Sequence, residues 1–250
     1  MSLLTNKIAF ITGASSGLGA ATALEMAREG ANLFLAGRNQ KALADIKQQA
    51  QALGAKVDTA SFDVADPDAC AAAVAQCIDY FGGLDALVNA AGVHRFYHAT
   101  DVTTEQWRAD LDTNLSGPFF LSQAAIPTLL ERKGNIVNVA SIAGLQGQAY
   151  SAAYCAAKHG LIGMTRSLAL EYSHSDLRVN VVCPGGMDTP QITHLQIPEG
   201  IDFDLMMRSA ALRGMMDPSQ VASVIAFIAS DKASAIHGSV YTVDQGKTVG

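Results

Sequence analysis

The chain has 250 residues, a length that suits one α/β domain, and 49% of them are hydrophobic against 16% charged, which is ample material for a large core. Aromatic residues make up only 6%, so that core must consist mainly of Ala, Val, Leu and Ile. The net charge of −6 and the lack of any basic run argue against a nucleic-acid partner.

Short apolar runs alternate with helical patterns along the whole chain. Strands are predicted at residues 7–12, 31–37, 56–64, 84–92, 134–141, 178–185 and 239–246. Helices are predicted between them at about 17–30, 39–53, 66–81, 104–132, 154–173 and 218–230, the fourth opening on a capping-box pattern at Thr103 and Gln106. Most strands lack polar alternation, as expected for strands covered on both faces. The pattern predicts an α/β fold of seven mainly parallel strands with helices on both faces, in a single domain over residues 1–250.

Residues 186–215 interrupt this alternation, because they are too many for a plain strand-to-helix loop. Two interpretations stay open: a lid over a ligand site, or a helical hairpin packed on its neighbour. The methionines of this insertion would suit an adaptable apolar pocket wall; they are Met187, Met206, Met207, Met215 and, just beyond it, Met216.

A glycine-rich stretch, TGASSGLG, follows the first strand from Thr12 to Gly19. Gly13, Gly17 and Gly19 permit a tight turn and a close approach of the backbone to a phosphate at the N-terminus of the next helix. The spacing G-x-x-x-G-x-G differs from the commoner dinucleotide pattern G-x-G-x-x-G. A plain turn is the alternative, but the position between the first strand and first helix favours a dinucleotide site.

The end of the second strand bears on which dinucleotide binds. Enzymes that use NAD usually place a carboxylate there for the ribose 2′-hydroxyl, whereas this chain has Gly37 followed by Arg38. A guanidinium group binds a 2′-phosphate with paired hydrogen bonds. The sequence therefore favours NADP(H), with NAD(H) possible if Arg38 is only a solvated surface residue.

Six motifs in one order resemble the short-chain dehydrogenase/reductases over nearly all 250 residues. They are TGASSGLG, NAAG (89–92), NLSG with Asn114, Ser141, YCAAK (154–158) and PGGMDT (184–189). The resemblance implies a Rossmann-type doubly wound sheet. The chain departs from the family pattern at Ala90, in place of a second asparagine, and at Gln245, in place of a glycine.

The resemblance also implies the contacts of a bound dinucleotide. Asp63 and the Val64 amide would bind the adenine, and Met187 and Thr189 would meet the nicotinamide carboxamide. The remaining contacts, on the ribose and phosphate groups, would come from Ser15, Ser16, Leu18, Asn89, Ala90 and Gly92.

The activity implied is reversible hydride transfer between the nicotinamide and a carbonyl or secondary alcohol. Tyr154 would act as general acid and base, and Ser141 would position the substrate oxygen. Lys158 lies one helical turn from Tyr154. An ammonium about 4 Å from the phenol stabilises the phenolate by about 4 kcal/mol at an effective dielectric near 20, enough to bring the pKa of Tyr154 towards neutrality. Burial of the phenol opposes this shift. Lys158 would also hold the nicotinamide ribose, and Asn114 would anchor a proton-relay water chain.

Several alternatives remain for substrate and function. The stretch VHRFYHATDVTTEQW (93–107) lacks the basic, methionine-rich character that suits docking of an acyl carrier, which favours a small ketone, sugar, steroid or alcohol over a 3-oxoacyl-carrier-protein substrate. The short tyrosine-to-lysine interval disfavours an enoyl reductase. The alternative to an enzyme is a non-catalytic, nucleotide-binding regulator with the same fold. We hypothesise that His94 or Arg95 helps to shape the substrate pocket. A metal site at His94 and His98 is not expected, because no pattern of carboxylate residues accompanies them.

The remaining expectations concern assembly and location. The family resemblance implies a homo-oligomer, a dimer or homotetramer. Cys70, Cys77, Cys155 and Cys183 have neither metal-ligand spacing nor the density of a disulfide scaffold, so free thiols in a reducing compartment are expected. The start MSLLTNKIAFIT is unlike a signal peptide, and no apolar stretch of about 18 residues predicts a membrane span. We expect a cytoplasmic protein without metal or membrane partner.

Overall fold

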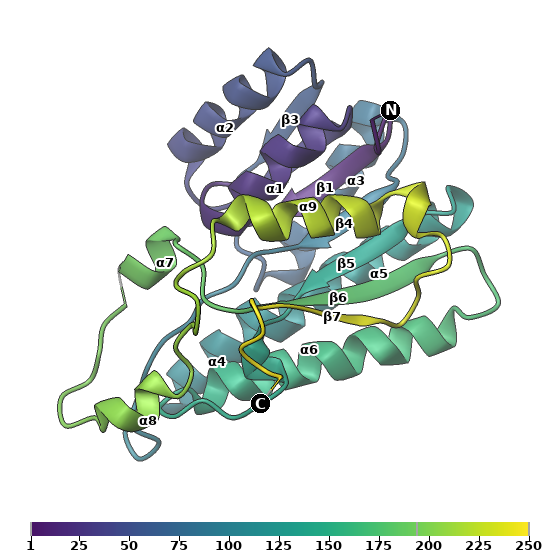
Figure 1. Cartoon of the computed structure of the whole chain (residues 1–250). Coiled ribbons are helices and arrows are strands. Elements are labelled where there is room, and N and C mark those ends of the chain that lie inside the picture. Colours follow the sequence, from purple (N-terminus) through teal and green to yellow (C-terminus); the bar gives the residue numbers. More distant parts are fainter. Residues whose placement is uncertain (1, 194, 250) are drawn as a thin grey trace.

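The computed structural model describes residues 2–193 and 195–249, and within them seven parallel strands form one sheet in the order β3-β2-β1-β4-β5-β6-β7 (Figure 1). The strands are β1 (Ile8–Thr12), β2 (Asn32–Ala36), β3 (Val57–Ala60), β4 (Ala86–Asn89), β5 (Asn135–Val139), β6 (Arg178–Pro184) and β7 (Val240–Val243). Each lies inside a range predicted from an apolar run. The doubly wound α/β architecture expected from the sequence is confirmed.

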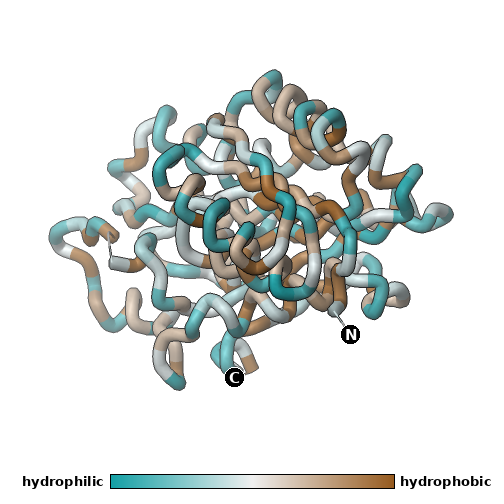
Figure 2. The backbone as a smooth tube through the Cα atoms, turned by 90° about the horizontal axis from the view of Figure 1, so that it is seen from above, coloured by the Kyte–Doolittle hydropathy of each residue, from teal (hydrophilic) through white to brown (hydrophobic). Residues whose placement is uncertain are grey.

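Helices cover both faces of the sheet. On one face lie α1 (Gly17–Arg28), α2 (Gln40–Ala52) and α9 (Pro218–Ala229), and on the other lie α3 (Pro67–Phe81), α5 (Gly117–Glu131) and α6 (Ala152–Glu171) (Figure 1). Each face has its own apolar core, and Figure 2 shows the hydrophobic residues gathered towards the middle of the molecule with hydrophilic residues on the outer turns. In the part of the chain that the structure describes, no helix is long and apolar enough to cross a membrane.

The helix predicted at 104–132 is not continuous. It consists of α4 (Thr104–Leu111), a π-helical turn at Asp112–Ser116, and α5. The side chain of Asn114 explains the break: its Nδ2 donates to the carbonyl of Asp110 at 2.9 Å, an oxygen that a regular helix offers to the backbone amide four residues later. The capping box is confirmed, since the backbone amides of Thr103 and Gln106 each bond the other's side chain.

The sheet changes winding direction between β1 and β4, and a crevice opens beyond their carboxyl ends. One hydroxyl ties the two strands together there. Thr12 Oγ1 accepts hydrogen bonds from the amides of Ala90 and Ala91, both at 3.0 Å. These amides are thereby taken from the strand ladder, so β4 ends at Asn89 rather than at residue 92 as predicted.

Candidate active site

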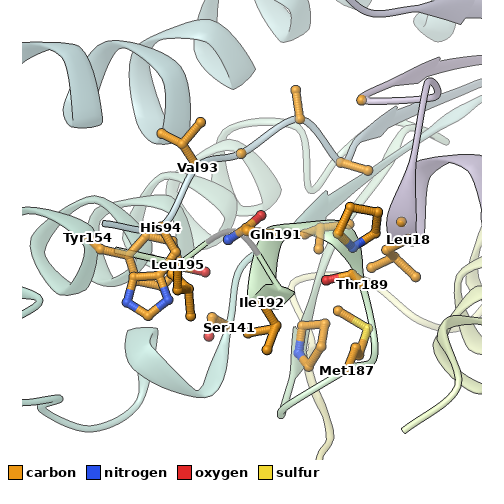
Figure 3. Close-up of a pocket in the computed structure, with 18 of the residues that line it drawn as sticks. Leu18, Val93, His94, Ser141, Tyr154, Met187, Thr189, Gln191, Ile192 and Leu195 are labelled. Atoms are coloured by element: carbon orange, nitrogen blue, oxygen red, sulfur yellow. The ribbon is translucent and has the colours of Figure 1, made fainter. Parts of the chain in front are cut away.

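A cavity of about 520 Å³ lies in the crevice between the glycine-rich stretch and the insertion at 186–215. Figure 3 shows Leu18, Met187 and Thr189 in one part of it and His94, Ser141 and Tyr154 in another. Most residues predicted to form a site line its wall; these are Gly13, Ser15, Ser16, Gly17, Leu18, Gly19, Arg38, Asp63, Val64, Ala90, Gly92, Ser141, Tyr154, Lys158, Met187 and Thr189. Asn89 and Asn114 lie behind the wall.

The glycine-rich stretch turns tightly on itself and packs against the loop after β4, at positions where a side chain would not fit. A Cβ on Gly19 would lie 2.2 Å from the carbonyl oxygen of Gly13, and one on Gly13, whose φ is +66°, would lie 2.9 Å from Ala91 Cα. Ser16, at the N-terminus of α1, makes no side-chain capping hydrogen bond. The first-turn amides of α1 are thus available to an anion beside the cavity, which fits the phosphates of a dinucleotide.

The end of β2 forms a further part of the cavity wall. A Cβ on Gly37 would lie 3.1 Å from Ser15 Oγ, so an acidic side chain there would crowd the glycine-rich stretch. Arg38 is exposed on the wall, and among the described residues its guanidinium has no hydrogen-bond or ion-pair partner. The next residue, Asn39, is already engaged, because its Oδ1 accepts from the amide of Ala42 to cap α2. A free guanidinium beside the cavity fits a phosphate group.

Asp63 and Asn89 differ in how directly they reach this space. Asp63 lies exposed on the wall after β3, with one carboxylate oxygen accepting from the amide of Ala65 at 3.0 Å. Asn89 is buried, and its Nδ2 donates to Asn138 Oδ1 at 2.9 Å. The Asn89 side chain therefore holds β4 against β5 instead of facing the cavity.

Tyr154 and Lys158 lie on one face of α6 beside Ser141, which follows β5. Tyr154 and Lys158 are 8% and 3% exposed. Burial raises the pKa of Tyr154 to about 12, and a hydrogen bond with Ser141 opposes the shift. Burial is the largest influence on the pKa of Tyr154 in this structure, and the lowering by Lys158 expected from the sequence stays a prediction. The Lys158 ammonium lies 5.6 Å from the centre of the Tyr154 ring and donates to the carbonyl of Val139 at 2.9 Å.

The ammonium is itself weakened by its surroundings, since burial lowers the pKa of Lys158 to about 8. The Tyr154 phenol and the Lys158 ammonium are therefore two largely desolvated polar groups that lie near each other on the cavity wall. Such desolvated titratable pairs in a cleft are typical of catalytic sites.

Asn114 supports this region from behind. Its Oδ1 accepts from the amide of Val93 at 3.1 Å, and its Nδ2 donates to the Val93 carbonyl at 3.0 Å. A Cβ on Gly92 would lie 2.9 Å from Asn114 Oδ1 and 3.5 Å from Lys158 Nζ, so both polar groups surround the same glycine. The π-helical turn thus places Asn114 near Lys158, with its side chain already bonded to the loop after β4.

His94 contacts Tyr154 directly. The two rings stack with centres 4.1 Å apart and planes at 18°, and His94 Nε2 lies 2.9 Å from Ser151 Oγ, just before α6 (Figure 3). Burial and, to a smaller extent, the Lys158 ammonium lower the pKa of His94 to about 4, so the ring is neutral at pH 7. Arg95 instead forms an ion pair with the buried Asp110 and does not line the cavity.

The insertion folds over the cavity. It contains two short helices, α7 (Pro190–Thr193) and α8 (Phe203–Met207), and it contributes several wall residues: Gln191, Ile192, Leu195, Ile197, Met206 and Met207. Two contacts hold it to the segments beside Tyr154: the Asp202 amide donates to Tyr150 Oη at 2.7 Å, and His98 Nε2 lies 2.8 Å from the Glu199 carbonyl oxygen. Residues of the insertion thus line the cavity, and a lid over a ligand site stays a prediction.

The cysteines are free thiols. Burial raises the pKa of Cys77 to about 12 and those of Cys70 and Cys183 to about 11. Among the described residues, no group of three or more His, Cys, Asp or Glu side chains is placed to hold a metal ion.

Sequence reasoning missed three contributors to the site. Thr12 joins β1 to the loop after β4, Ser151 bonds His94, and Tyr150 anchors the insertion. Only Thr12 carried a signal, as a polar residue closing an otherwise apolar strand. Ser151 and Tyr150 act through contacts between segments distant in sequence, which no local pattern reveals.

Known proteins are similar to this chain in sequence and fold. A family model described as enoyl-(acyl carrier protein) reductase matches residues 13–248. A cyclohexanol dehydrogenase of Acinetobacter sp. (strain SE19) is 37% identical, over 97% of this chain and 95% of that protein. A 3-oxoacyl-[acyl-carrier-protein] reductase of Thermotoga maritima is 36% identical, over 98% and 99%.

A similar solved structure is that of a short chain dehydrogenase from Mycobacterium paratuberculosis bound to NAD. It aligns with a TM-score of 0.91 and 27% identity, over 99% of this chain and 100% of that one. The match extends over nearly the whole chain and includes the motif-bearing segments that line the cavity. The chain belongs to the short-chain dehydrogenase/reductase family, whose members act as oxidoreductases on alcohol and carbonyl groups with NAD(P).

Proposed function

We propose that this protein is an NADP(H)-dependent oxidoreductase that interconverts a carbonyl compound and a secondary alcohol, with Tyr154 as general acid and base. The observation that carries the proposal is the meeting of Tyr154, Ser141 and Lys158 on the wall of the same cavity that the glycine-rich stretch borders. When bound, the nicotinamide supplies or accepts the hydride. The side chains of this chain orient the substrate and move the proton.

The proton step follows from the chemistry of the two hydroxyl groups. As a carbonyl is reduced, negative charge develops on its oxygen, and the Tyr154 phenol is positioned to donate a proton to it. A phenol whose pKa is raised to about 12 is reliably protonated at pH 7, which suits the acid role. Ser141 donates a hydrogen bond to the same oxygen. In the reverse direction the phenolate is needed, and a positive charge nearby, such as that of Lys158, lowers the cost of forming it.

The preference for NADP(H) rests on the end of β2. Gly37 offers no carboxylate to repel a 2′-phosphate, and the Arg38 guanidinium lies free on the wall. The other proposed cofactor contacts are the wall residues of the glycine-rich stretch and of the segments after β3, β4 and β6, with Asp63 and Val64 towards the adenine and Met187 and Thr189 towards the carboxamide.

Titration with NADPH and NADH tests the cofactor preference. NADPH should bind at least about tenfold tighter, and Arg38→Asp should abolish that difference because it replaces an attraction by a repulsion. Lys41→Glu is the control for net charge, since Lys41 is exposed on α2 and does not line the cavity. Equal binding of NADH by the unmodified protein would overturn the preference for NADP(H) and leave the reaction class standing.

Turnover tests the reaction class. Ketone-dependent oxidation of NADPH should fall by roughly 10²- to 10⁴-fold in Tyr154→Phe, with NADPH binding retained. Tight NADPH binding without turnover of any ketone or alcohol would instead support a nucleotide-binding regulator.

A carrier-protein substrate is not favoured. The loop after β4 offers Arg95 to an acidic carrier, but that guanidinium is already paired with Asp110. Assembly into a homo-oligomer is also part of the proposal, since Trp107 of α4 and Phe119 of α5 leave apolar rings 39% and 41% exposed. Light scattering on the purified protein tests it.

A further inference from the structure

The substrate end of the cavity is the part bordered by the insertion, by the loop after β4 and by Tyr154. Its apolar wall residues are Val93, Phe96, Ile142, Ile192, Leu195, Ile197, Met206, Met207, Ala210, Ala211 and Met215. Its polar side chains beyond Ser141 and Tyr154 include, among the described residues, His94, Gln148, Gln191 and Ser209. Ile192 and Leu195 line the same cavity as Ser141 and the stacked pair of His94 and Tyr154, and all five are labelled in Figure 3.

Formal charge is sparse on the wall of the cavity. Among the described residues that line the cavity, the charged side chains are Arg38, Asp63 and Lys158. Arg38 and Asp63 follow β2 and β3, at the edge of the sheet away from the insertion. Lys158 is 3% exposed and donates to the Val139 carbonyl. Among the described residues, the one cation beside the substrate end is therefore the buried Lys158 ammonium, which is already bonded to a backbone carbonyl.

The basic residues nearest in sequence to this end are engaged or outside it. Arg95 is paired with Asp110, and Arg208 and Arg213 of the insertion are exposed and do not line the cavity. The insertion carries twice as many carboxylates as guanidinium groups, and the whole chain has a net charge of −6. His94 is neutral at pH 7 because burial and the Lys158 ammonium hold its pKa near 4. A carboxylate bound here would lose hydration without gaining a free cationic partner among the described residues.

We infer that the substrate is an uncharged, mainly apolar ketone or secondary alcohol, and that carboxylate- or phosphate-bearing substrates are rejected. The inference rests on the proposed function and narrows its substrate class. The reacting oxygen meets Tyr154 and Ser141, while the rest of the molecule lies against the aliphatic and thioether side chains of the insertion. The unbranched methionines Met206, Met207 and Met215 adjust to different shapes, so several apolar skeletons should be accepted.

A matched set of rigid cyclic ketones tests this inference: 4-methylcyclohexanone, methyl 4-oxocyclohexanecarboxylate and 4-oxocyclohexanecarboxylate. The first two are neutral and the third is an anion of similar size. With saturating NADPH, kcat/KM for both neutral ketones should exceed that for the anion by at least about 100-fold, as expected for burying an unpaired carboxylate.

Two variants of one wall residue show whether charge is the cause. Met207, on α8, is 58% exposed and lies at the rim, so a longer polar side chain there remains solvated. Met207→Lys should raise kcat/KM for the anion at least about tenfold, whereas Met207→Gln, of similar length and neutral, should not. Activity with 4-methylcyclohexanone is measured for both variants, and the ratio of kcat/KM for the anion to kcat/KM for this ketone separates the effect of charge from any loss of apolar contact.

Binding separates this inference from the proposed function. Thermal unfolding in the presence of NADP⁺ and each ketone reports binding without turnover. Stabilisation by the neutral ketones alone, without turnover, would refute the proposed function and keep the substrate class. Turnover or binding of the anion at a level equal to the neutral ketones would refute the substrate class and keep the oxidoreductase. Failure of both neutral ketones to bind or react would also overturn the substrate class.

Discussion

Burial of the Lys158 ammonium has a thermodynamic cost that Lys158→Met should reveal. Burial lowers the pKa of Lys158 from 10.5 to about 8 in the folded protein. Below pH 8 the lysine is protonated in both the folded and unfolded states, and the shift corresponds to about 3 kcal/mol of lost stability. Between pH 8 and 10.5 the unfolded chain binds the extra proton, so the stability of the unmodified protein rises with pH in that window.

Lys158→Met removes this titration and keeps a side chain of similar length. The variant also loses the hydrogen bond to the Val139 carbonyl, a penalty present at every pH. The measurable quantity is therefore the change with pH. The difference in unfolding free energy, variant minus unmodified protein, should fall by roughly 2.5 kcal/mol between about pH 7 and pH 10.

Urea denaturation at intervals across this range measures the difference, with Lys41→Met as the control because Lys41 is exposed on α2. The control difference should stay constant with pH. A Lys158→Met difference that also stays constant, within about 0.5 kcal/mol, would show that Lys158 is not desolvated as the structure indicates. The same variant should lose nearly all activity, so stability and catalysis make opposite demands on this position.

Substitutions at two further positions, His94 and Gln245, test other features of the structure. His94→Phe keeps a ring against Tyr154 but loses the hydrogen bond to Ser151, whereas His94→Ala loses both. In steady-state assays kcat/KM should fall about tenfold in the alanine variant and less in the phenylalanine variant. Equal losses in the two variants would contradict a role for the stacking. Gln245→Gly should stabilise the fold by about 1 kcal/mol, because Gln245 has a φ of +54° that glycine adopts without strain; a lower midpoint in urea denaturation would contradict this reasoning.

The strands were predictable because they are buried on both faces and so appear as apolar runs. Their ends were not. Ala90 and Ala91 continue the apolar run of β4, yet their amides bond Thr12 instead of a neighbouring strand. Composition alone does not distinguish an apolar residue in a strand ladder from one held by a side chain of another strand.

Most of the candidate site was predictable because its parts lie in short motifs at the carboxyl ends of strands. Asn114 was identified by its motif, but the π-helical turn that places it depends on a bond between its own side chain and the Asp110 carbonyl. The apolar lining contributed by α7 and α8 depends on how the insertion folds back, which no periodicity in residues 186–215 indicates. The burial of Tyr154, which raises its pKa, could not be predicted from the sequence either.

The base of the insertion has a consequence for how its length can vary. Met187 and Met216 form an isolated parallel bridge; the Asp188 amide donates to the Met216 carbonyl at 2.9 Å and the Met216 amide to the Gly186 carbonyl at 3.0 Å. The two ends of the insertion are thus joined at the edge of the core, and residues between them can be added or removed without pulling on β6 or α9. Doubling the length of such a closed loop costs only about 0.6 kcal/mol. The length and sequence of the insertion can therefore vary between related chains while the sheet and the glycine-rich stretch keep their structure.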